Sequence, residues 1–96
     1  MYQIQWTEYS KDDYEKLDGS QKVFVDKALD RIKLRGMKAG HPLRGNLAGC
    51  NRLKNNRMGL RVIFREIEGK VEVIQIVVIG KRGNNEVYNI ASTRLK

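Results

Sequence analysis

The chain has 96 residues, 19 of them lysine or arginine against 11 acidic residues, giving a formal net charge of +8. This length suits one domain, which we place over residues 1–96, and a hydrophobic content of 41% argues against a disordered chain. The only cysteine, Cys50, excludes an intramolecular disulfide and fits a reducing compartment. The N-terminus lacks a secretory apolar region, and the longest apolar run is too short to span a bilayer. We therefore expect a soluble cytoplasmic protein with no membrane partner.

The positive charge is concentrated in the middle of the chain. No acidic residue lies between Asp30 and Glu66, yet this interval holds ten of the 19 basic residues. Such a segment predicts a polyanionic partner, with nucleic acid the leading candidate. A solvated basic surface that only keeps the protein soluble is the alternative.

The first third of the chain predicts one strand and two helices. Residues 2–6 alternate between apolar and polar, as a half-buried strand does. Ser10 followed by Asp13 resembles a capping box, which predicts a short helix ending at about Leu17. A second helix is expected from about residue 21 to residue 35. Its apolar stripe comprises Val25, Ala28, Leu29 and Ile32.

The rest of the chain predicts a sheet. Gly36 is placed to cap the second helix, and a Gly- and Pro-containing connector follows it. Strands are expected at roughly 50–56, 59–67 and 71–79, with a tight turn at "EGK" and the third strand in the centre of the sheet. A short terminal helix capped by Asn84 or Asn85 is expected after Gly80. The order β-α-α-β-β-β with this helix predicts an α+β fold, with two N-terminal helices packed on one face of a mainly antiparallel sheet.

Basic side chains are expected on one face of the hairpin formed by the first two of these three strands. A turn centred between residues 57 and 58 places Lys54 opposite Arg61, with Arg52 and Arg65 on the same face. Like charges that face each other destabilise a sheet, but they are useful when an anion has to fit between them.

Phosphodiester cleavage is the chemistry that such a face could perform. Cations placed around the phosphate stabilise the charge that builds up when an RNA 2′-hydroxyl attacks phosphorus, and no metal is needed. Lysine and tyrosine can exchange protons, whereas arginine stays charged and serves as a phosphate ligand. One histidine, His41, and one cysteine cannot make a zinc site, so we expect no metal and no cofactor.

Two segments, "HPLRGNLAGCNRLKNNRMGLRVIF" and "IVVIGKRGNNEVY", resemble the RelE branch of the RelE/ParE toxin superfamily. The first shows a basic-x-Lys strand and then Gly-x-Arg opening the next strand. The second shows an apolar strand that runs into Gly-Lys-Arg, with Val-Tyr shortly after it. The resemblance covers nearly the whole chain and implies a toxin of a type II toxin–antitoxin pair, which cuts mRNA in the ribosomal A site.

The resemblance also implies roles for individual residues. Lys54 corresponds to the centre of proton transfer, and Arg61 to the ligand of the scissile phosphate. Arg82 corresponds to an arginine tied to phosphate binding or leaving-group protonation, and Tyr88 to a tyrosine that stacks on a base. Arg52 stands where relatives commonly have lysine, so a base at that position has to be replaced by Lys54 or Tyr88. Three further basic residues complete the predicted catalytic and RNA-contacting set: Arg52, Arg65 and Lys81.

The implied partners are a cognate antitoxin, the ribosome and mRNA. The remaining basic residues are then expected to contact ribosomal RNA of the small subunit: Arg31, Lys33, Arg35, Lys38 and Arg44. Two alternatives stay open. One is a ParE-like toxin that inhibits DNA gyrase without nuclease activity, and the other is an RNA-binding module of the same fold without catalysis.

Overall fold

A computed structural model of the chain describes the backbone of residues 1–96 and every side chain except that of Asn84. Its elements, in chain order, are β1 (Gln3–Trp6), α1 (Glu8–Glu15), α2 (Gly19–Arg35), η1 (Gly36–Ala39), β2 (His41–Pro42), η2 (Gly45–Leu47), β3 (Cys50–Asn55), β4 (Leu60–Glu66), β5 (Val73–Lys81), η3 (Gly83–Asn85) and α3 (Glu86–Arg94). The α+β class and the predicted order are confirmed. The structure adds the two-residue strand β2 and three short 3₁₀ turns.

The five strands form one sheet in the order β1-β5-β4-β3-β2. The β1–β5 pair is parallel, and the other three pairs are antiparallel, as the expected mainly antiparallel sheet requires. The central position belongs to β4, and β5 lies beside it, so the expectation that the third predicted strand is central was wrong by one place.

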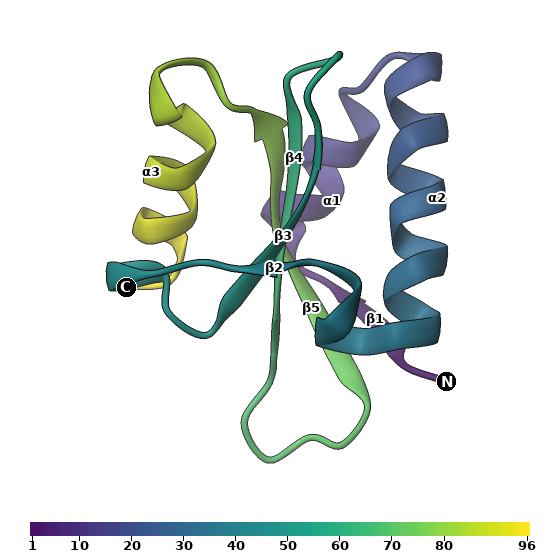
Figure 1. The fold of residues 1–96 in the computed structure, drawn as a ribbon, viewed down its shortest axis with the longest axis vertical. Helices are drawn as coiled ribbons and strands as arrows, with labels where there is room; N and C mark the ends of the chain where they lie inside the picture. Colours follow the sequence, from purple (N-terminus) through teal and green to yellow (C-terminus); the bar gives the residue numbers. More distant parts are fainter.

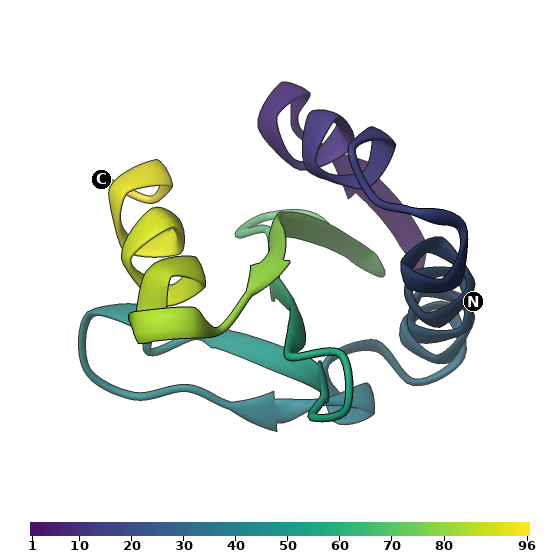
Figure 2. The ribbon, with the colours of Figure 1, turned by 90° about the horizontal axis from the view of Figure 1, so that it is seen from above.

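Helices cover both faces of the sheet (Figures 1 and 2). The N-terminal pair, α1 and α2, lies on one side, and α3 lies on the other. Each side has its own apolar cluster, one built around Phe64 and Ile32 and the other around Ile63 and Val87. None of the helices among the described residues has the length and apolar composition needed to cross a bilayer.

Both N-terminal helices begin with a capping box. The first begins earlier than predicted: Thr7 is its N-cap, and Ser10 is the fully buried N3 partner rather than the cap. Asp18 and Gln21 form the equivalent box of α2, and hydrogen bonds from Gln21 and Ser20 lower the pKa of the Asp18 carboxyl. Gly36 caps α2 as predicted, with a φ of 61° that favours glycine.

The β3–β4 register matches the prediction, with Lys54 opposite Arg61 and Arg52 opposite Ile63. The predicted tight turn at "EGK" is present, closed by the Lys70 N–H donating to the Ile67 carbonyl oxygen at 3.1 Å, but it does not by itself join the two strands. The chain takes residues 67–72 to pass from β4 to β5, and Gly69 and Glu72 both adopt positive φ.

A bulge divides β5 into two registers. Ile63 pairs with Val78 and Phe64 with Ile76, which leaves Val77 without an opposite residue. As a result, Ile76 and Ile79 pack in the α1/α2 cluster, whereas Val77 and Val78 pack beneath α3. The bulge explains how an apolar run serves both faces of the sheet.

Candidate active site

Four of the predicted residues meet where the β3–β4 hairpin passes beneath the first turns of α3. Arg52 and Lys54 come from β3, Arg61 from β4, and Tyr88 from α3. The strand residues share the α3 side of the sheet because strand periodicity sends alternate side chains to the same face. The buried residues Val87 and Ala91 fix α3 on that face.

The Tyr88 hydroxyl is the point where the cluster converges. It accepts hydrogen bonds from Arg52 Nη1 at 2.8 Å and from Arg61 Nε at 3.3 Å. The Arg52 guanidinium carbon also lies 6.0 Å from the centre of the Tyr88 ring, within the range of a cation–π contact. Two strands and one helix are therefore joined through a single phenol oxygen.

Arg61 is buried, with 4% of its surface exposed. Its Nη1 donates to the carbonyl oxygen of Leu60 at 2.9 Å, and its Nη2 donates to Asn56 Oδ1 at 3.2 Å. Every acceptor around this guanidinium is thus neutral. A buried cation without a carboxylate is costly in a folded protein, and such groups are concentrated at functional sites.

The other cations of the cluster also lack acidic partners. Among the described side chains, ion pairs join only Lys16 to Asp12 and Arg94 to Asp13. Arg52 Nε is buried without a hydrogen-bond partner. Lys54 is exposed directly across the strand pair from Arg61. The cluster therefore presents uncompensated positive charge, which suits an anionic ligand.

Lys81 and Arg82 lie at the same end of the sheet. Lys81 pairs with Leu60, and the Arg82 backbone N–H donates to the Gly59 carbonyl oxygen at 2.9 Å. Both side chains are exposed. Arg82 thus adds a cation beside the turn of the β3–β4 hairpin, whereas Lys81, paired with Leu60 of the α1/α2 cluster, lies on the opposite face of the sheet from Tyr88.

Arg65 is on the predicted face but away from this cluster, about 13 Å along β4 from Arg61 by strand rise. Its Nε donates to Gln75 Oε1 at 2.9 Å, and Gln75 in turn donates to Gln5 at 3.1 Å. It faces Cys50, where burial raises the pKa of the thiol and the nearby Arg65 charge partly offsets that rise. The structure therefore does not bring Arg65 together with Lys54 and Tyr88.

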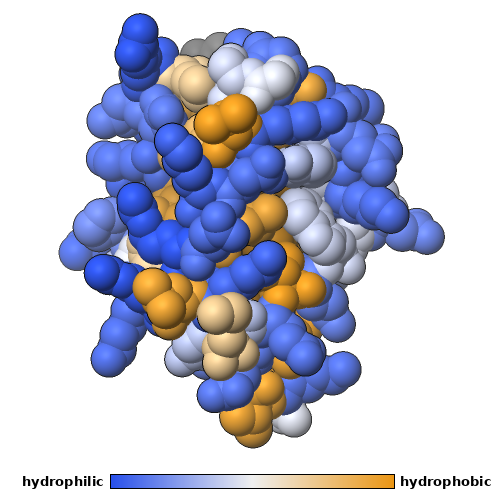
Figure 3. Space-filling view, turned by 90° about the vertical axis from the view of Figure 1, so that its right-hand side faces the viewer, coloured by the Kyte–Doolittle hydropathy of each residue, from blue (hydrophilic) through white to orange (hydrophobic). Residues whose placement is uncertain are grey.

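The five residues predicted to contact ribosomal RNA are all exposed, but they are not all together. Arg31, Lys33 and Arg35 are on α2, and Lys38 follows in η1. Arg44 instead precedes η2, which packs against α3 on the opposite side of the sheet. The side of the molecule that carries α2 is largely hydrophilic, with hydrophobic patches between the charged side chains (Figure 3).

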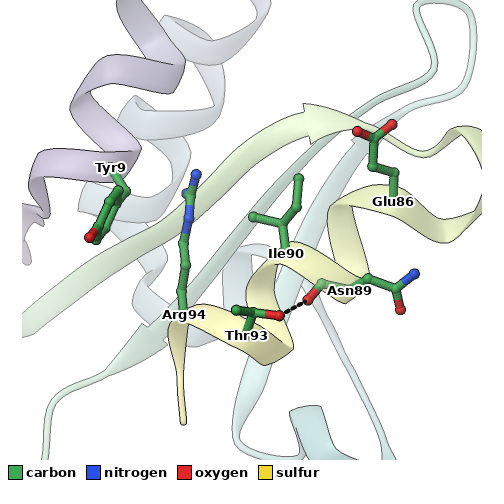
Figure 4. Close-up of a pocket in the computed structure, with 6 residues that line it drawn as sticks. All are labelled: Tyr9, Glu86, Asn89, Ile90, Thr93 and Arg94. Atoms are coloured by element: carbon green, nitrogen blue, oxygen red, sulfur yellow. Dashed lines mark hydrogen bonds between the residues drawn. The ribbon is translucent and has the colours of Figure 1, made fainter.

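A groove of about 550 Å³ lies between α1 and α3 (Figure 4). Its lining consists of Tyr9, Glu86, Asn89, Ile90, Thr93 and Arg94. None of the predicted site residues lines it. The predicted catalytic residues instead lie on the other side of α3, where Tyr88 contacts Arg52 of β3 and Arg61 of β4.

Sequence reasoning missed Asn56, whose amide oxygen accepts a hydrogen bond from the central arginine. Asparagine is an ordinary residue of turns, so its presence between two strands carries no functional signal. Only the register of the hairpin reveals the contact.

The fold of this chain is similar to that of RelE toxins. A curated Escherichia coli protein named as a RelE-like toxin is 29% identical over 99% of this chain and 98% of its own length. A double arginine-to-alanine mutant of E. coli toxin RelE in the free state has a TM-score of 0.80 at 25% identity, covering 99% of this chain and 98% of its own. The isolated E. coli RelE toxin gives 0.75 at 25% identity over the full length of both chains. The same mutant in complex with a peptide of the antitoxin RelB gives 0.74 at 24% identity, over 94% of this chain and 93% of its own.

No family model matches the chain. The sequence and structural likenesses confirm the resemblance to the RelE branch of the RelE/ParE toxin superfamily.

Proposed function

We propose that this chain is the toxin of a type II toxin–antitoxin pair and a ribosome-dependent endoribonuclease that cleaves mRNA in the ribosomal A site. The observation that carries the proposal is the Tyr88 hydroxyl held between Arg52 and Arg61, with Lys54 across the strand pair. The likeness to RelE toxins over nearly the whole chain supports it. A gyrase inhibitor or a passive RNA-binding module would not need this convergence of proton donors and cations.

The proposed reaction is attack of an RNA 2′-hydroxyl on the adjacent phosphorus. The bond from phosphorus to the 5′-oxygen breaks, which leaves a 2′,3′-cyclic phosphate and a 5′-hydroxyl. Negative charge grows on the nonbridging oxygens, and Arg61 and Arg52 are placed to stabilise it. Stabilisation by fixed cations is worth several kcal/mol of barrier, of the order of the ~3 kcal/mol measured for one preorganised donor elsewhere.

Two protons have to move in this reaction. The Tyr88 hydroxyl accepts from two guanidinium groups, and its own proton has no acceptor among the described side chains. It can therefore pass this proton to the departing 5′-oxygen. Lys54, exposed opposite Arg61, is the group assigned to the 2′-hydroxyl proton. Arg82 is assigned to a flanking phosphate, and Lys81, on the other face of the sheet, to an RNA contact outside the cluster.

We also propose a cognate antitoxin as the partner that restrains this activity. Structurally similar proteins include the E. coli RelBE toxin–antitoxin complex and a RelE mutant in complex with a peptide of the antitoxin RelB. Because this chain has a net charge of +8, it would be complemented by an antitoxin segment that carries acidic residues beside apolar ones. The ribosomal A site supplies the second polyanionic surface, bound in a salt-dependent way.

The test is primer extension on a defined mRNA in a purified translation system, with stalled ribosomes present or omitted. Wild type, Arg61→Ala, Tyr88→Phe and Lys54→Ala are compared. A cut inside the A-site codon that needs ribosomes and falls by at least about 100-fold in Arg61→Ala supports the proposal. An intact message on correctly stalled ribosomes refutes the nuclease proposal. DNA damage in cells that express the protein would then favour the alternative, a toxin that inhibits DNA gyrase. A passive RNA-binding module would change only its affinity in Tyr88→Phe and Lys54→Ala.

A further inference from the structure

The geometry points to Asn56 as a positioning residue that orients the Arg61 guanidinium toward the scissile phosphate, an inference that rests on the proposed nuclease function. Asn56 follows β3 in the hairpin turn, and its Oδ1 accepts from Arg61 Nη2 at 3.2 Å. It is exposed, whereas Arg61 is buried. The contact therefore joins a buried charge to the solvent-facing rim of the site.

The turn itself fixes the position of Asn56. The Met58 backbone N–H donates to Asn55 Oδ1 at 3.0 Å, and the Gly59 N–H donates to the Asn56 carbonyl oxygen at 3.3 Å. Gly59 adopts a φ of 67°, which lets the chain reverse directly. The Asn56 amide is thus presented to Arg61 by a turn whose backbone is already bonded.

Asn56 completes the set of contacts on the guanidinium. Arg61 has three nitrogens, and each has one acceptor: Tyr88 Oη on Nε, the Leu60 carbonyl on Nη1 and Asn56 on Nη2. A guanidinium has five N–H groups, so one on each Nη remains for a phosphate oxygen. Removing the Asn56 acceptor leaves the Nη2 side of the plane free to reorient.

The neutral charge of Asn56 matters as much as its shape. An amide oxygen orients the cation and leaves its charge available to the phosphate. An aspartate of the same shape would keep the hydrogen bond but would compete with the phosphate for that charge. The two variants therefore test different effects: Asn56→Ala removes the hydrogen bond that holds the guanidinium, whereas Asn56→Asp keeps the hydrogen bond and partly neutralises the charge.

The first arm of the test measures cleavage of mRNA on stalled ribosomes by single-turnover primer extension. Asn56→Ala is expected to lower the maximal rate about tenfold, the loss typical of one hydrogen bond to a charged group, with a change below about threefold in the ribosome concentration for half-maximal rate. Asn56→Asp is expected to lower the rate further, about 100-fold. Asn89→Ala, an exposed asparagine on α3 away from Arg61, is the matched control and should cleave like wild type.

The second arm of the test does not depend on nuclease activity. NMR of arginine-labelled protein measures rotation of the Arg61 guanidinium, with its signals assigned by their loss in Arg61→Ala. Rotation should be slow in wild type and in Asn56→Asp, and faster in Asn56→Ala. In an Arg61→Ala background, adding Asn56→Ala should not reduce residual cleavage further, because the residue acts through the arginine.

The outcomes separate the two ideas. If wild type leaves the message intact, the proposed function fails, while the NMR arm still decides whether Asn56 holds Arg61. Wild-type cleavage by Asn56→Ala overturns the inference. So does a slower rate with unchanged Arg61 rotation, because the effect would then arise elsewhere.

Discussion

The Asp13–Arg94 pair is expected to contribute more to stability than any other ion pair that the structure describes. Asp13 lies on α1 and Arg94 at the end of α3, and their side chains are 16% and 20% exposed. Arg94 Nη1 and Nη2 bind the two carboxylate oxygens at 2.7 and 3.1 Å. Figure 4 shows Arg94 reaching toward α1.

The pair also satisfies the open edge of β5. Because β1 ends at Trp6, opposite Ile76, the next residues of β5 have no strand on that side. Asp13 Oδ2 accepts from the Ile79 N–H at 3.1 Å, and Arg94 donates to the Val77 carbonyl oxygen at 2.9 Å. Loss of either side chain therefore leaves both a partner charge and a backbone group unsatisfied.

Breaking a fully buried pair costs about 3–5 kcal/mol, and the partial exposure here reduces the expected cost of Asp13→Asn to about 2–3 kcal/mol. A domain of this size has about 5–14 kcal/mol of stability in total. The expected fall in Tm is about 10–20 °C. Urea unfolding measures the free energy, with Arg61→Ala as the common background so that the proposed toxicity does not limit expression.

The neighbouring residue on the same helix provides the control. Asp12 pairs with Lys16 at 2.9 Å, but the two side chains are 60% and 75% exposed. Asp12→Asn should therefore cost less than about 0.5 kcal/mol. Equal costs for Asp12→Asn and Asp13→Asn would refute the reasoning. So would additive costs when Asp13→Asn is combined with Arg94→Gln, because groups in direct contact should be coupled.

Three further changes have clear expected outcomes. Gly40→Ala should lower the free energy of unfolding, measured by urea titration, by about 1–3 kcal/mol, because the added Cβ would clash with the Arg52 carbonyl oxygen of β3. Gly19→Ala is the control: the start of α2 has open space around this residue, so the same titration should show no change or a gain of up to about 1 kcal/mol. Cys50 should react with iodoacetamide at pH 8 more slowly than a free thiol, since burial raises its pKa and lowers the thiolate fraction, and urea should remove the difference; equal rates without urea would contradict this. Replacing Arg31 and Arg35 together by glutamine should weaken ribosome binding about three- to tenfold at low salt and less at high salt. The single-turnover cleavage rate on saturating ribosomes should not change. A loss of binding that does not depend on salt would exclude an electrostatic contact.

Local patterns predicted the three α-helices, every strand except β2, and the hairpin face that carries positive charge. Strand periodicity and the turn after Asn55 determined the β3–β4 register, so Lys54 and Arg61 could be set opposite each other from sequence. The error at the start of α1 arose because Thr7 and Ser10 share the box that had been assigned to Ser10 and Asp13. Both serine and threonine favour N-caps, and burial decides between them.

The remaining features depend on contacts between distant parts of the chain. Asp13 appears in sequence as one of several charges on an amphipathic helix, yet it closes the edge of β5 together with a residue 81 positions later. Tyr88 and Arg52 are 36 positions apart, and periodicity in neither segment indicates that they share a hydrogen bond. Both contacts depend on the packing of α3. Arg94 binds Asp13 at one end of the helix, and Tyr88 contacts the arginines of the cationic site near the other end. Because one short helix connects the edge of β5 to the cationic site, loss of the Asp13–Arg94 pair should lower cleavage as well as stability, even though neither residue is near the proposed phosphate site.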